Sequence, residues 1–162
     1  ISVEASIMEG SQQLILTGSL GSVLRESAQT ALSYIRSHID ELSVPRDFFR
    51  GSDLHIHIPA GAVPKDGPSA GLTILMALIS LLTRRPARRD VAMTGELTLS
   101  GRILPVGGAR EKILAAQRAG VKTVIFPAQN KSDIDGLEEE SRAGVEVILA
   151  SEIARILDVV LV

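Results

Sequence analysis

The segment "VPKDGPSAG" brings one serine, Ser69, to the start of a long apolar run. A serine at such a place commonly caps a helix by satisfying a free backbone N–H group. A helix start also favours an anion, either a phosphate or the oxyanion of an attacked carbonyl group. A serine beside a base becomes a nucleophile. The residue types therefore leave three roles open for Ser69.

The neighbours of Ser69 argue against a cap as its only role. Asp66 stands three residues earlier and is itself able to cap the helix. Gly67 and Gly71 remove side chains on both sides of the serine, so another backbone can approach closely. A nucleophilic role for Ser69 requires a base elsewhere in the chain that would activate the hydroxyl group.

Two histidines lie just upstream of this loop. His55 and His57 in "HIHI" point to the same face of an expected strand. Such a pair can act as a base or bind a metal, but no third ligand follows at a suitable spacing, and the chain has no cysteine. We interpret the pair as the polar face of a strand, His38 as a surface residue near a helix end, and expect no metal site.

Among the four lysines, Lys112 is placed differently from the others. On a helical wheel it falls beside Ala115, Ala116 and Ala119, whereas its charged neighbours gather on the opposite side. Small neighbours leave room around the amine, and a partly dry setting disfavours its charged form, which would allow it to act as a general base. Periodicity alone favours equally a lysine whose amine reaches water.

The bulk composition is that of an ordinary folded domain. The chain has 162 residues, 45% apolar and 22% charged, with a formal net charge of −2. This charge gives no electrostatic reason to expect nucleic acid as a partner, and we interpret the arginines of "RRPARR", residues 84–89, as a solvated loop. No signal peptide is visible, and the apolar run after Ser69 is too short to span a membrane.

The elements that must position these residues follow from periodicity and turn signals. We predict a hairpin from residues 3–8 and 13–18, a helix over 22–42, a strand over 53–60, a helix over 69–82, two or three short strands within 91–108, a helix over 109–120 closed by Gly120, a strand over 122–127, a polar helical or loop segment over 130–144, a strand over 145–150, and a last helix over 151–161 with Ser151 as its N-cap.

This order indicates one α/β or α+β domain without repeats or an internal linker. The chain opens at Ile1 in an alternation already under way, so we expect residues 1–162 to be a fragment of a longer protein.

The motifs "PKDGPSAG" and "MTGELTLSGRILPVGGAREKILAAQRAGVKTVIFP" closely resemble the proteolytic domain of the Lon family of ATP-dependent proteases. The resemblance covers nearly the whole chain. It implies a compact α/β domain of mixed sheets with flanking helices, of the kind seen in domain 2 of ribosomal protein S5. It also implies that Ser69 is the nucleophile of a serine endopeptidase, that Lys112 is its general base, and that Thr94 orients the lysine amine.

Three loop residues before Ser69 are expected to support this chemistry. We place the oxyanion hole at backbone N–H groups from Gly67 to Ser69, with Pro68 between them. Asp66 has two possible roles: it caps the helix, or it forms an ion pair with Lys112 in an inactive arrangement.

The resemblance further implies unfolded protein substrates, a homohexameric ring, a cytoplasmic location, and an ATPase module of the AAA+ class elsewhere in the full-length chain. The sequence has no Walker-type motif, so we expect no cofactor in this domain and place ATP and Mg²⁺ on the ATPase module. Two alternatives remain: a non-catalytic Lon-like ring-forming domain, and a phosphate-binding module.

Overall fold

A three-stranded sheet forms the first layer of the structure, a computed structural model that describes all residues 1–162. Its strands are β1 (Glu4–Glu9), β2 (Leu14–Thr17) and β3 (Ser52–His57), in the spatial order β1-β3-β2. β1 runs antiparallel to β3, and β2 runs parallel to it.

The predicted hairpin between the first two strands is therefore wrong, because β3 lies between them. Leu54 and Ile56 of β3 are fully buried, which suits the central position of a sheet. The side chain of Asp53 accepts hydrogen bonds from the N–H groups of Ser11 (2.8 Å) and Gln13 (2.9 Å), which fixes the β1–β2 connection across the end of β3. Burial and this long-range contact override the local turn signal.

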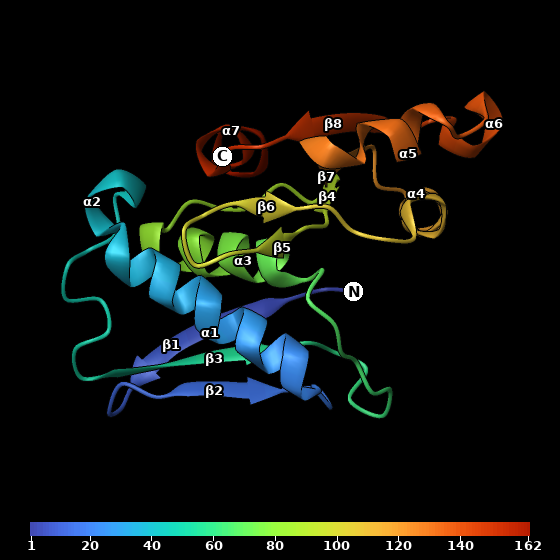
Figure 1. The fold of residues 1–162 in the computed structure, drawn as a ribbon. Helices are drawn as coiled ribbons and strands as arrows, with labels where there is room; N and C mark the ends of the chain where they lie inside the picture. The colour runs from blue at the N-terminus through green and yellow to red at the C-terminus, as the bar shows by residue number, and fades with distance from the viewer.

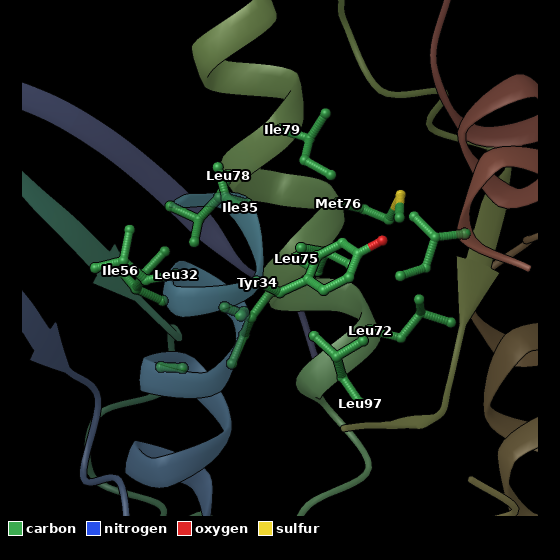
Figure 2. Close-up of a cluster of buried hydrophobic side chains, with 14 of the residues drawn as sticks. Leu32, Tyr34, Ile35, Ile56, Leu72, Leu75, Met76, Leu78, Ile79 and Leu97 are labelled. Carbon is green, nitrogen blue, oxygen red and sulfur yellow. The ribbon is translucent and has the colours of Figure 1, made fainter. Parts of the chain in front are cut away.

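Two helices cover one face of this sheet, α1 (Ser22–Ser37) and α3 (Gly71–Thr83) (Figure 1). The expected helix over 22–42 is interrupted at His38, after which the short α2 (Ile39–Leu42) follows. Figure 2 shows the core where α1, α3 and β3 meet. The side chains of α3 itself are apolar around nearly the whole helix, and that is why α3 is the most deeply buried helix.

The second sheet lies on the other side of α3 and is entirely parallel (Figure 1). It contains β4 (Val91–Met93), β7 (Thr123–Pro127) and β8 (Glu146–Ala150), in the order β4-β7-β8. All five residues of the central β7 are buried, as expected for a parallel strand covered on both faces.

The remaining elements flank this second sheet. They are the two-stranded pair β5 (Glu96–Leu97) and β6 (Ile103–Leu104), the helices α4 (Ala109–Arg118), α5 (Lys131–Asp135), α6 (Glu139–Arg142) and α7 (Ile153–Val160), and the 3₁₀ helix η1 (Ala128–Asn130). The alternation of strands and helices expected for the second half is confirmed, as is the mixed α/β fold.

The two predicted helix ends of this half have different outcomes. Gly120 has the left-handed conformation expected just after α4, with a φ of 72°. Ser151 is not an N-cap, because α7 starts one residue later than expected and its N-cap is Glu152.

The arginine segment, residues 84–89, is exposed as predicted. A hydrogen bond from the Arg88 N–H to the Val160 carbonyl (2.8 Å) also joins it to the C-terminal segment. None of the helices has both the length and the apolar character that a membrane crossing requires.

Candidate active site

Ser69 lies in the turn that leads into α3 and not inside the helix. The helix begins at Gly71, and its N-cap, Ala70, has a helical backbone conformation. No side chain caps this helix, so the cap role that we considered for Ser69 is not realised. The serine hydroxyl, which is partly buried, is free to serve another group.

The backbone of Ser69 is held by a neighbouring segment. Its carbonyl oxygen accepts hydrogen bonds from the Gly95 N–H (3.0 Å) and from the Thr94 hydroxyl (3.4 Å). A side chain on Gly71 would come within 3.2 Å of the Leu97 nitrogen, so the close backbone approach predicted for this glycine occurs. These contacts fix the serine against the start of β5.

Gly67 has a different reason to be glycine. No atom would lie within 4 Å of a side chain added there, so close packing does not require it. Its φ is 103°, a value that favours glycine strongly. The turn before Ser69 therefore depends on the backbone freedom of Gly67.

Lys112 reaches Ser69 from α4, which starts three residues earlier. The lysine Nζ lies 3.5 Å from the serine Oγ, although 43 residues separate the two along the chain. Lys112 is partly buried, and Ala115, Ala116 and Ala119 line the same groove, as the helical wheel predicted. The next residue, Ile113, is fully buried in a cluster with Val124 and Phe126 of β7, which anchors the helix that carries the lysine.

Thr94 is buried and lies at the end of β4. Its hydroxyl donates to the Ser69 carbonyl, and no hydrogen bond joins it to the Lys112 amine. The expected role of Thr94 in orienting the lysine stays a prediction. What the geometry adds is a contact that sequence reasoning missed, in which this threonine and Gly95 hold the nucleophile's backbone.

Asp66 caps a helix, but a different one from the helix that we expected. Its carboxylate accepts a hydrogen bond from the Leu24 N–H (3.0 Å) in the first turn of α1. This bond and one from the Gly67 N–H hold the pKa of the Asp66 carboxyl below its ordinary value. Gly21, the N-cap of α1, has no side chain, and a Cβ atom there would lie 2.3 Å from the Asp66 carboxyl carbon.

The ion pair between Asp66 and Lys112, our other expectation for this residue, is absent from this structure. The carboxylate is engaged with α1, and the Lys112 amine faces Ser69 instead. The arrangement therefore leaves the lysine amine available to the serine.

A groove of about 520 Å³ joins these residues. Ser69, Thr94 and Lys112 line it together, and most of the remaining wall is apolar, including Met76 and Val91. A second hollow, of about 360 Å³, lies between β8 and the α5–α6 region and contains none of the three. The first groove is therefore the candidate active site.

The histidines lie outside this groove. His55 and His57 both contact the Thr17 hydroxyl, at 2.8 and 2.7 Å, on the open face of the first sheet. His38 Nδ1 lies 2.9 Å from the carbonyl of Tyr34. No group of three or more histidine, acidic or cysteine residues is placed to hold a metal ion.

Comparisons with known proteins identify the family of the chain. The family described as Lon protease (S16) C-terminal proteolytic domain matches residues 1–162. The chain is 55% identical over 159 residues to the Lon protease of Roseiflexus castenholzii, covering 98% of this chain and 20% of the relative. It is 53% identical over 162 residues to Lon protease 1 of Bacillus subtilis, covering 100% of this chain and 21% of the relative. The chain thus spans about a fifth of the length of these relatives.

Proposed function

The chain belongs to the Lon protease (S16) C-terminal proteolytic domain family, and we propose that it is a serine endopeptidase whose nucleophile is Ser69 and whose general base is Lys112. The observation that carries the proposal is the 3.5 Å approach of the Lys112 Nζ to the Ser69 Oγ inside one groove. A contact across 43 residues of sequence requires the fold and does not follow from local structure.

In the proposed reaction the unprotonated Lys112 amine accepts the proton of the Ser69 hydroxyl as Oγ attacks the scissile carbonyl carbon. The resulting ammonium gives that proton to the leaving amine, and the new N-terminus departs. Water then cleaves the acyl-enzyme, with the same lysine as base. An amine has no tautomer to fix, so no aspartate is needed.

In the loop before α3, one backbone N–H group is left as the donor of the oxyanion hole. Pro68 has no N–H, and the N–H of Gly67 lies beside the Asp66 carboxylate and helps to lower its pKa. The Ser69 N–H has no acceptor among the backbone hydrogen bonds and lies next to the attacking oxygen. We propose that the Ser69 N–H donates a hydrogen bond to the oxyanion that forms on the scissile carbonyl group.

The lining of the groove supports a proposal about the kind of substrate. Apolar side chains such as Met76, Ala77 and Val91 line the same groove as Ser69, so burial of an apolar substrate side chain in the groove is favourable. β4 is an edge strand of its sheet and borders the same groove. An extended, unfolded segment fits these features, because its backbone is free to pair with an edge strand.

The wider setting is part of the proposal. Because the chain spans about a fifth of the length of its relatives, we propose that ATP and Mg²⁺ bind at an AAA+ module outside this sequence. We further propose that the domain acts within a homohexamer, in the cytoplasm, on unfolded protein substrates.

Replacement of the two proposed catalytic residues tests the function. Ser69→Ala and Lys112→Ala should each lower kcat for an unstructured protein or fluorogenic peptide by at least about a thousandfold. His55→Ala and His57→Ala serve as controls and should leave most of the activity. Loss of activity in a histidine variant, together with an active Lys112→Ala protein, would show that the base is misassigned.

A further inference from the structure

We propose that Lys65 is a positioning residue for the Ser69 loop, residues 60–69. This inference rests on the proposed role of Ser69 as the nucleophile. The Lys65 ammonium donates to three carbonyl oxygens, those of Gly18 (2.6 Å), Ala60 (2.9 Å) and Val63 (2.8 Å). These bonds use all three donors of a lysine ammonium. Lys65 forms no ion pair, so its charge is engaged only by backbone oxygens.

The three carbonyls belong to two segments that are distant in sequence. Gly18 follows β2, whereas Ala60 and Val63 belong to the loop after β3. The backbone of Lys65 joins the same two segments, because its N–H donates to the Ser19 carbonyl (2.9 Å) and its carbonyl accepts from the Gly21 N–H (2.8 Å). Lys65 is thus bound through both its side chain and its backbone.

Apart from Lys65, two hydrogen bonds hold the loop between β3 and Lys65, one from the Ser19 hydroxyl to the Gly61 carbonyl and one from the Val63 N–H to the Ala60 carbonyl (3.0 Å). Residues 60–64 are all exposed, so burial of apolar surface contributes little to their order. Ala60 has a φ of 67°, an uncommon conformation for alanine that requires support from its surroundings. The lysine ammonium binds the carbonyl of this same residue and provides such support.

The path from this anchor to Ser69 is short. Asp66 is bound to the first turn of α1, so Gly67 and Pro68 are the only residues between that contact and the serine. On its other side Ser69 is fixed through its carbonyl by Gly95. Because Gly67 adopts its conformation freely, the direction from which the chain reaches Ser69 is set by Lys65 and Asp66.

Removal of the ammonium should therefore displace the serine without unfolding the protein. The carbonyls of Gly18 and Val63 would then lose the ammonium as their donor, and the carbonyl of Ala60 would keep only the Val63 N–H, so the three would separate to reach water. The loop would open at residues 60–64, which are all exposed. A small displacement of a nucleophile lowers the rate of the chemical step more than it lowers substrate binding.

The test compares Lys65→Met and Lys65→Gln with Lys131→Met, whose lysine forms only an exposed ion pair with Asp135. We expect Lys65→Met to lower kcat for a fluorogenic peptide by about tenfold or more, with KM changed less than about twofold. Lys65→Gln keeps two of the three donors and should fall between Lys65→Met and the parent protein. Lys131→Met should match the parent, and the melting temperatures of all four proteins should agree closely.

The outcomes separate this inference from the proposed function. If Ser69→Ala is inactive while Lys65→Met and Lys65→Gln keep the parental kcat, the inference fails and the function stands. If Ser69→Ala remains active, the proposed function fails. If both Lys65 variants are unfolded, Lys65 supports the fold as a whole, which overturns a role specific to the serine loop.

Discussion

The two side chains of the proposed dyad come from regions that are packed very differently. Ser69 precedes α3, in which eight of 13 residues are buried, and this helix belongs to a core cluster of 30 buried residues. Lys112 is carried by α4, in which three of ten residues are buried, within a cluster of six. The nucleophile therefore stands on the more firmly packed part of the molecule.

This difference indicates which partner determines the geometry. Local stability follows buried apolar contacts, so α4 should move more readily than α3. The 3.5 Å distance between the Lys112 Nζ and the Ser69 Oγ is then sensitive mainly to the placement of α4. Hydrogen bonds of catalytic residues often shorten only when substrate is bound, and a modest shift of α4 would be enough here.

Cavities introduced at α3 and at α4 should have the largest effects on the free energy of unfolding. Leu75 and Ile113 are both fully buried, on α3 and α4 respectively. Leu75→Ala should lower the free energy of unfolding by about 2–5 kcal/mol, and Ile113→Ala should lie near the lower end of that range. We expect Ile113→Ala nevertheless to reduce kcat more, when kcat is corrected for the folded fraction. Urea denaturation and peptidase assays at one temperature measure both quantities, and a larger corrected loss in Leu75→Ala would reverse the comparison.

Removal of the hydrogen bond between the Thr94 hydroxyl and the Ser69 carbonyl should have an intermediate effect on stability. Thr94→Val removes the hydroxyl that donates to the Ser69 carbonyl and should lower the free energy of unfolding by about 0.5–1.5 kcal/mol. If the hydroxyl also orients the Lys112 amine, kcat should fall by about tenfold in addition. Thr94→Ser keeps the hydroxyl and is the matched control. An unchanged kcat in Thr94→Val would restrict this threonine to holding the serine backbone.

The smallest effect should come from the contact between the serine loop and α1. The pKa of Asp66 lies below its ordinary value of 3.8, because the ionised carboxylate accepts the Leu24 N–H. Ionised Asp66 therefore stabilises the folded state above about pH 4, and this stabilisation is lost as the pH falls through the lower, folded-state pKa. The stability difference between the parent and Asp66→Asn, measured by urea denaturation, should be constant near neutral pH and shrink in acid. A difference that persists unchanged to about pH 2 would contradict this.

Local patterns predicted the elements that carry the site. The apolar run gave α3, the helical wheel placed Lys112 beside small alanines, and the position of Gly120 predicted the end of α4. These features depend on residues within a few positions of one another, so they can be read from the sequence. The pairing of Ser69 with Lys112 was implied by family resemblance, whereas periodicity left the role of Lys112 undecided.

The errors and omissions involve contacts that are long in sequence. The order β1-β3-β2, the bond from Leu24 to Asp66 and the binding of Gly18 by Lys65 each join residues about 40 positions apart or more. A local turn signal favoured a hairpin, and a local spacing favoured Asp66 as the cap of α3. In both places a distant partner satisfied the backbone groups better.

The sequence by itself determined where most of the helices and strands form, because side-chain periodicity acts within a few residues. Its motifs pointed to Ser69 and Lys112 through their resemblance to a family, since periodicity left the role of Lys112 undecided. Only the tertiary structure decided which strand is central, which helix Asp66 caps, and that the Lys112 amine lies beside the Ser69 hydroxyl. Those outcomes depend on burial and hydrogen bonding summed over the whole chain, and no short segment contains that information.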